Sequence, residues 1–196
     1  DWMPPYMERC EALGQYGWDW KFFLAQPEPW IHQGYRHVEI IPMRLNQFDD
    51  LVEETIGVRI RNELIHSGPV AWPRKLLSCY YPCHGAIFKR WCNGYDYWGH
   101  TNWDMVFGRL DQWITDDLLL SCDIFGNDPD AINGCFSMYK NVDRINHLFM
   151  EYPDWKRVLS YPGPDNMFVF DEACMTHLVR DKHAAGEIRF ASDWFM

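Results

Sequence analysis

The sequence predicts an α/β fold in which a mixed, mostly parallel sheet is flanked by helices. Short apolar segments with strand-like alternation, such as residues 18–24 and 37–43, recur along the chain. Segments with apolar residues at helical spacing lie between them. Strands that alternate with helices favour a largely parallel sheet. The 196 residues are enough for one domain with a substantial core, so we expect a single domain over residues 1–196.

The first half is predicted to contain two helices and two strands. Pro4 and Pro5 open a helix that runs to about Gln15, since proline is well tolerated in a first helical turn. Asn46 caps a second helix that Gly57 ends. The strands cover residues 18–24 and 37–43.

The second half shows shorter elements. Pro73 and Pro82 begin helical segments, the second of which runs to about Cys92. The predicted strands are residues 95–103, 122–126 and 135–140. Further helices begin at Thr115 and Asn141, and the last runs from Asp171 to about Lys182.

Composition excludes several classes of partner. The formal net charge is −10 and basic residues form no long run, which disfavours nucleic acids and anionic membrane surfaces. No apolar run reaches the length of a membrane span, so we expect no transmembrane segment in this chain. Seven scattered cysteines indicate reduced thiols rather than a disulfide framework. The compartment stays open between the cytoplasm and, if the full-length protein has an upstream anchor, the Golgi lumen.

The step Asn102-Trp103-Asp104 is the first candidate site. It ends the predicted strand 95–103, and open α/β folds bind ligands at the carboxyl ends of their strands. Asp104 is a hard oxygen ligand suited to Mg²⁺ or Mn²⁺, ions that proteins usually share with substrate phosphates. Asn102 supplies hydrogen bonds but lacks the negative charge that helps to hold such an ion. The alternative is that Asp104 only caps the following turn.

Two further candidates lie elsewhere in the chain. Asp171 and Glu172 stand at a helix start, where they either cap the helix or provide a general base for an acceptor hydroxyl. Lys75 is either a solvated surface charge or a point charge for a diphosphate. The grouping of Cys79, Cys83, His84 and Cys92 raises a zinc site, but its spacing lacks the paired knuckles of common zinc sites, so ordinary buried thiols are expected.

Several motifs occur in an order that is more specific than any one of them. They are Pro5-Tyr6, Ile41-Pro42-Met43, Lys75-Leu76 before Pro82 and Gly85, the run from Gly94 to Gly99 leading into Asn102-Trp103-Asp104, Phe107-Gly108, the run from Phe136 to Asn141, and Phe170-Asp171-Glu172. Over nearly the whole chain this order resembles a bacterial and fungal group of glycosyltransferases with the GT-A fold, long carried as a domain of unknown function.

The resemblance implies a GT-A-like, Rossmann-like domain that uses a nucleotide-sugar donor and a saccharide acceptor. It places a divalent metal ion, Mn²⁺ or Mg²⁺, at Asp104, and the donor ribose or sugar at Asn102. Asp171 or Glu172 would then lie near the acceptor. It further implies that the chain starts after the first strand of the fold, and that Ser78 and Tyr81 replace charged residues of the family pattern.

The predicted function is therefore a metal-dependent glycosyltransferase that moves a sugar from a nucleotide-diphosphate sugar to a hydroxyl of a saccharide or glycoconjugate. Lys75, Asn102 and Asp104 would bind the donor and its metal ion, and Asp171 or Glu172 would act on the acceptor. One alternative is a non-catalytic carbohydrate- or nucleotide-binding domain that kept the fold. Another is a metal-dependent phosphohydrolase in which water takes the place of the acceptor.

Overall fold

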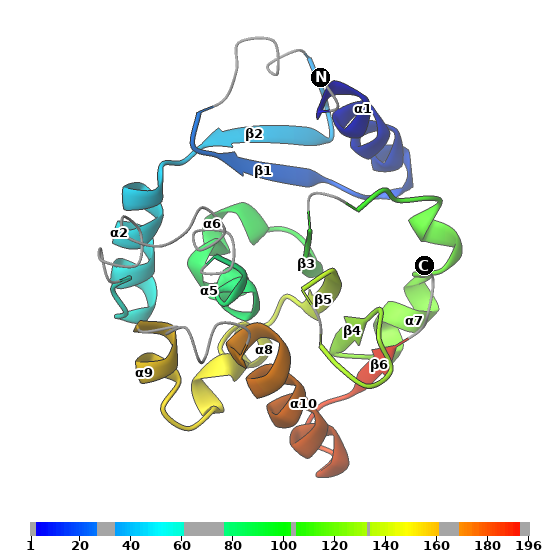
Figure 1. Ribbon diagram of the computed structural model, residues 1–196. Helices are drawn as coiled ribbons and strands as arrows, with labels where there is room; N and C mark the ends of the chain where they lie inside the picture. The colour runs from blue at the N-terminus through cyan, green and yellow to red at the C-terminus, as the bar shows by residue number, and fades with distance from the viewer. Residues whose placement is uncertain are drawn as a thin grey trace. The chain divides into compact units, whose positions relative to one another are not determined.

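The computed structural model describes residues 3–26, 34–60, 77–102, 105–132, 134–160 and 169–192, and these residues form a mixed α/β architecture (Figure 1). They divide into two compact units. The first comprises Asp1–Leu51 and Asp104–Thr115, and the second Val52–Trp103 and Asp116–Met196. The predicted α/β class is confirmed, but the strands form two small sheets, one of two strands and one of four.

The first unit is a helix beside a parallel pair of strands. Its elements are helix α1 (Met3–Leu13), a short 3₁₀ turn (Gly14–Tyr16), strands β1 (Trp20–Leu24) and β2 (Val38–Pro42), and a second 3₁₀ turn (Leu110–Gln112). β1 and β2 pair in parallel, with Trp20 opposite Val38. Gly17 closes the first turn with a φ of 88°, a conformation that glycine adopts without strain. The predicted first helix and both strands are confirmed.

Contacts between α1 and the start of β2 hold this unit together. Tyr6, Met7, Cys10 and Val38 form its buried cluster. The carboxylate of Glu11 accepts hydrogen bonds from the backbone N–H groups of Arg36 and His37, at 2.9 and 2.7 Å.

Helix α2 (Leu45–Ile56) contains the boundary between the units. Phe48, Val52 and Ile56 are buried at helical spacing, and Gly57 follows the helix with a φ of 67°, as the sequence predicts. Asn46 is not the N-cap, however, because the helix begins one residue earlier. The side chain of Gln47 accepts a hydrogen bond from the backbone N–H of Arg44 at 2.8 Å, which is half of a capping box.

The second unit surrounds the four-stranded sheet with short helices. They are 3₁₀ turn η3 (Tyr81–Cys83), α5 (His84–Ile87), α6 (Lys89–Cys92), α7 (Asp116–Ser121), α8 (Asp143–Asn146), 3₁₀ turn η5 (Leu148–Glu151), α9 (Trp155–Ser160), π-helical turn η7 (Val169–Cys174) and α10 (Met175–Ala184).

Two helix predictions need correction in this unit. The predicted helix from Pro82 to Cys92 is interrupted at Phe88, whose φ and ψ of −101° and 25° leave the helical region. Asn141 does not cap α8, because Val142 occupies that position. The amide of Asn141 instead donates to the carbonyl oxygens of Cys92 and Tyr95, at 2.7 and 2.8 Å.

The four-stranded sheet has the order β3-β5-β4-β6 (Figure 1). Its strands are β3 (Tyr97–Thr101), β4 (Ile124–Gly126), β5 (Phe136–Lys140) and β6 (Phe190–Ser192). β5 runs antiparallel to β3 and β4, and β6 runs parallel to β4. This sheet is therefore mixed and not mostly parallel. β3 is also shorter than predicted and alternates in burial, because its successive side chains point to opposite faces of the sheet.

Aromatic packing covers one face of this sheet. The rings of Trp98 and Tyr139 stack with centroids 4.4 Å apart, and Nε1 of Trp98 donates to Oδ1 of Asn146 at 2.7 Å. A Cβ atom on Gly85 would lie 2.4 Å from that Nε1 and 2.5 Å from that Oδ1, so this position accommodates only glycine without rearrangement.

None of the seven cysteines forms a disulfide, and five of them are buried, which confirms the prediction from their scatter. Among the described helices, none is long and apolar enough to cross a membrane.

Candidate functional site

The topology of the second unit brings several strand ends to one edge of its sheet. β3, β4 and β6 run in one direction and β5 in the other. Thr101 at the end of β3 pairs with Phe136 at the start of β5, and Gly126 at the end of β4 pairs with Ser137 and Ser192. Open α/β sheets bind ligands outside the carboxyl ends of their strands. This edge is therefore where a site is expected.

Asn102 follows β3 at this edge and is held by the start of β5. Its backbone N–H donates to the carbonyl oxygen of Cys135 at 3.1 Å, and its side-chain Nδ2 lies 3.7 Å from Sγ of Cys135. Its Oδ1 accepts a hydrogen bond from the hydroxyl of Tyr81 at 3.4 Å. The weak sulfur contact and the long hydroxyl contact orient the carboxamide without saturating its oxygen.

Asp171 reaches the same place from the turn η7. A Cβ atom on Gly134 would lie 3.5 Å from Oδ2 of Asp171 and 3.6 Å from Cε2 of Tyr81. The hydroxyl of Tyr81 therefore contacts Asn102, and its ring lies near Gly134, as Asp171 does. The structure thus brings together two residues that the sequence singled out, Asn102 and Asp171, with Tyr81 and Gly134 between them.

The carboxyl group of Asp171 is buried, and it forms no ion pair in the ranges that the structure describes. Its residue is 4% exposed, and within the described part of the chain Oδ1 has no hydrogen-bond partner. Burial raises the pKa of Asp171 to about 6, and the charge of Glu172 adds to the rise. Hydrogen bonds from the backbone and from Ser78 act in the opposite direction and only partly offset it. A carboxylate with such a pKa is suited to proton transfer near neutral pH.

Glu172 differs from its neighbour because its side chain is exposed. The π-helical turn explains the difference, since consecutive side chains on a helix point in different directions. Single π-helical turns are often found at functional sites. Of the two predicted carboxylates, only Asp171 faces the sheet edge.

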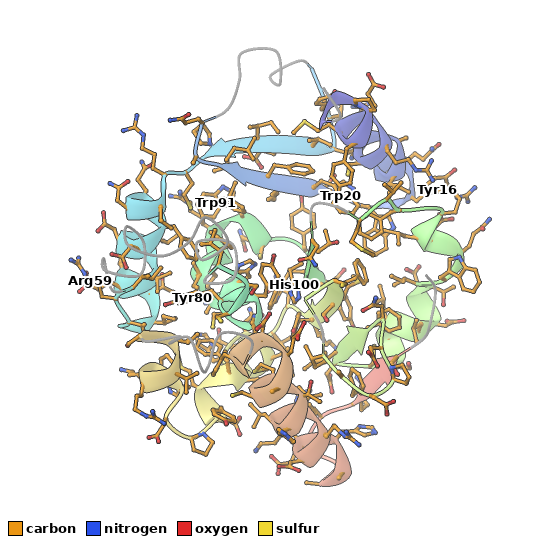
Figure 2. The ribbon with its side chains drawn as sticks, viewed as in Figure 1. Tyr16, Trp20, Arg59, Tyr80, Trp91 and His100 are labelled. Atoms are coloured by element: carbon orange, nitrogen blue, oxygen red, sulfur yellow. The ribbon has the colours of Figure 1, made fainter. Side chains whose placement is uncertain are left out.

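Two histidines, His84 and His100, pack against the ring of Tyr81. The rings of Tyr81 and His100 stack with centroids 4.5 Å apart, and His84 contacts both rings edge-on. Figure 2 labels His100, which extends from β3. Burial and the neighbouring His100 lower the pKa of His84 to about 3, so this imidazole is neutral at physiological pH.

Several of these residues escape sequence reasoning. The sequence indicates Tyr81 and Ser78 only as departures from a family pattern, and it gives no indication of a role for Gly134. Asn127, which follows β4 at the same edge, is fully buried, and neither of its side-chain polar atoms has a hydrogen-bond partner among the described residues. The available signal was the placement of polar residues directly after a strand.

Lys75 and Asp104 lie outside the described residues. Within the described ranges, no group of three or more histidine, cysteine, aspartate or glutamate side chains lies close enough to hold a metal ion. Cys79, Cys83, His84 and Cys92 are among the residues that this finding covers. It leaves the metal prediction at Asp104 as a prediction.

The sequence matches the model of one protein family over residues 12–191, a family described as one of unknown function (DUF6625). The chain belongs to this family. The matched range of DUF6625 contains Tyr81, Asn102, Gly134 and Asp171, and it reaches into both compact units. No curated protein and no solved structure matches the chain.

Proposed function

We propose that this protein is a metal-dependent glycosyltransferase with a GT-A-like fold, which moves a sugar from a nucleotide-diphosphate sugar to a hydroxyl of a saccharide or glycoconjugate. The observation that carries the proposal is the buried carboxylate of Asp171, which lies near Asn102 and forms no ion pair among the described residues. Transfer to a hydroxyl needs a base, and a carboxylate whose pKa is raised to about 6 is a competent one near pH 7.

In the proposed step Asp171 is the general base. The carboxylate accepts the proton of the acceptor hydroxyl while the hydroxyl oxygen forms a bond to the anomeric carbon of the donor sugar. The bond between that carbon and the diphosphate oxygen breaks, and its electron pair leaves with the nucleoside diphosphate. A base at this position suits an inverting displacement. Glu172 contributes its charge, which helps to keep the pKa of Asp171 high.

On the donor side we assign Asn102, Asp104 and Lys75. The carboxamide oxygen of Asn102 makes only a long contact to Tyr81, so it can accept a further hydrogen bond or coordinate a cation. Asp104 would provide the charged ligand, and Lys75 a point charge for the diphosphate. Bound Mn²⁺ or Mg²⁺ would neutralise the charge of the leaving diphosphate.

One alternative has its own supporting observation. Asn102 replaces the acidic residue expected two positions before Asp104, and a neutral amide contributes less to holding a divalent ion. A non-catalytic carbohydrate- or nucleotide-binding domain would tolerate this replacement. Such a domain would bind a nucleotide or sugar but release no nucleotide from a sugar donor.

Calorimetric titration of UDP and GDP, with and without Mn²⁺, tests the donor side. We expect nucleotide binding that requires Mn²⁺ and is lost in Asp104→Ala, because removal of the charged ligand weakens the binding of the ion. Asp117→Ala, at an exposed aspartate in the first turn of α7, is the matched control and should bind as the wild type does. Absence of binding by a folded sample under every condition would contradict the proposal. Binding without turnover would favour the non-catalytic domain.

A further inference from the structure

The turn that follows Leu77 binds the π-helical turn η7 through two consecutive residues. The hydroxyl of Ser78 donates a hydrogen bond to the carboxylate of Asp171. The sulfur of Cys79 accepts a hydrogen bond from the backbone N–H of Phe170, the residue directly before Asp171. Cys79 and Phe170 are both buried, so the second contact lies in the interior of the second unit. The two contacts together fix the turn against Asp171.

The residues that follow Ser78 are held by the rest of the second unit. Figure 2 labels Tyr80, whose hydroxyl donates to the carbonyl oxygen of Leu159 at 2.8 Å. The backbone N–H of Cys83 donates to the carbonyl oxygen of Tyr80 at 2.9 Å. The hydroxyl of Tyr81 reaches Asn102 at 3.4 Å. Ser78 therefore belongs to an anchored segment, and its bond to Asp171 is part of a set of contacts that span the second unit.

The two oxygens of the Asp171 carboxylate have different surroundings. Within the described part of the chain, Oδ1 has no hydrogen-bond partner, so the bond from Ser78 goes to Oδ2. A hydrogen bond from a hydroxyl to a carboxylate oxygen stabilises the charged form of the group. Oδ1 is thereby left as the oxygen that takes up a proton.

We propose that Ser78 is a positioning residue for the general base: its hydroxyl holds Oδ2 of Asp171 and keeps the carboxylate ionised, so that Oδ1 can accept the proton of the acceptor hydroxyl. The inference rests on the proposed function and adds a residue to the same site. Ser78 acts through Asp171 and takes no proton itself.

The other titratable groups around Asp171 do not take over this role. Burial raises the pKa of the thiols of Cys79 and Cys174 and of the phenol of Tyr139, so all three groups are neutral near pH 6. The charge of Glu172 raises the pKa of Asp171. Backbone N–H groups of Asp171 and Glu172 act in the same direction as Ser78, but a side-chain substitution does not remove them. The contact that mutation can test is therefore the one from Ser78.

Titration of Asp171 tests the contact without any substrate. In protein whose aspartate carboxyl carbons carry carbon-13, the nuclear magnetic resonance signal of Asp171 is the one that Asp171→Asn removes. We expect Ser78→Ala to raise the pKa of Asp171 by about one unit, from about 6 to about 7, because a hydrogen bond to a charged group contributes on this scale. Ser78→Thr keeps the hydroxyl and should titrate as the wild type does.

Ser160→Ala is the matched control. Ser160 is partly buried like Ser78, but its hydroxyl donates to the carbonyl oxygen of Lys156 at 2.7 Å and not to a carboxylate. Loss of this hydroxyl should leave the pKa of Asp171 unchanged. The inference would be overturned if the pKa of Asp171 did not move in Ser78→Ala, or if it rose equally in Ser160→Ala.

The pH profile of nucleotide release tests the role in turnover. A rise of one pKa unit lowers the ionised fraction of Asp171 about tenfold at pH 5 and hardly at all at pH 8.5. We expect kcat of Ser78→Ala to fall by these factors, and kcat of Ser78→Thr and Ser160→Ala to stay close to the wild-type value at both pH values. A general structural defect would lower kcat of Ser78→Ala by the same factor at pH 5 and pH 8.5, and that result would overturn the inference.

The two measurements separate the inference from the function on which it rests. If the wild type transfers sugar and the pKa of Asp171 is the same in Ser78→Ala, the inference fails and the transferase stands. If the pKa moves as expected but the wild type neither binds nor releases nucleotide, the proposed function fails. The hydrogen bond from Ser78 would then stand, and its role in catalysis would be refuted together with the function.

Discussion

The second unit contains two buried aspartates that differ in their partners. Asp123, directly before β4, is 2% exposed, and Asp171 is 4% exposed. Oδ1 of Asp123 lies 2.9 Å from a guanidinium nitrogen of Arg144 and 3.3 Å from one of Arg189. Within the described residues, Asp171 has no ion pair and one oxygen without a hydrogen-bond partner.

The two carboxyl groups titrate in opposite directions for this reason. Burial favours the neutral form of both, but hydrogen bonds from Arg189 and Arg144 outweigh it at Asp123 and lower the pKa. At Asp171 burial dominates and raises the pKa to about 6. Burial alone therefore does not mark a functional aspartate. The informative feature is burial without an oppositely charged partner, because such a group costs stability and is often found at a functional site.

The largest expected difference concerns turnover. Asp171→Asn removes the base and should lower kcat by about 10²- to 10⁴-fold, the usual contribution of a general base. The measurement is nucleotide release from the donor in the presence of an acceptor. Glu172→Gln changes the exposed neighbour in the same way, and it should lower kcat by less than about tenfold because Glu172 is not the base. A larger loss in Glu172→Gln than in Asp171→Asn would reverse the assignment of the base.

The next effect is on stability and depends on pH. The pKa of Asp171 rises from 3.8 to about 6 on folding, so stability linked to this group is full below pH 3.8 and is lost as pH rises through 6. This loss amounts to up to about 3 kcal/mol, at 1.36 kcal/mol per pKa unit. Asp171→Asn should thus be more stable than the wild type at pH 7.5 and similar to it at pH 4. Urea unfolding at both pH values measures this, and a variant less stable at pH 7.5 would indicate a cation paired with Asp171.

The smallest expected effect is the loss of stability in Asp123→Asn, which is opposite in sign to the gain expected in Asp171→Asn. Asp123→Asn removes the charge that pairs with Arg144 and Arg189, and should destabilise the protein by about 2 kcal/mol at pH 7.5, the scale of hydrogen bonds to charged groups. Both arginine side chains are about half exposed, so water can solvate them and limit the cost. Urea unfolding of the two asparagine variants side by side makes the comparison. If both variants changed the free energy of unfolding in the same direction at pH 7.5, the distinction between Asp123 and Asp171 would be refuted.

The sequence predicted elements whose cause is local. Periodicity located β1, β2 and α2, and Gly57 marked the end of α2, because amphipathic spacing and a positive φ are properties of a few consecutive residues. Strand direction is not local, and so the reversal of β5, which makes the sheet mixed, was missed. The predicted caps at Asn46 and Asn141 were wrong, because Gln47 binds the backbone at the start of α2 and the amide of Asn141 donates to the distant carbonyl oxygen of Cys92.

The same distinction between local and long-range causes applies to the candidate site. Asp171 and Asn102 were recognisable because polar residues follow or end an apolar segment. Their environment was not, because Tyr81 reaches Asn102 across 21 residues and Asn102 reaches Cys135 across 33. The contrast between Asp171 and Glu172, which are adjacent in sequence, arises only from the direction in which one helical turn points each side chain.

The contact between Asn102 and Cys135 gives the site a chemical handle of its own. Cys135 and Cys92 are the two cysteines that are partly exposed, and Cys135 lies beside the carboxamide of Asn102. With Cys92 replaced by serine, alkylation of Cys135 would report on this edge of the sheet alone. Protection of that thiol could then be used to screen sugars and nucleotides for occupancy before any reaction has been observed.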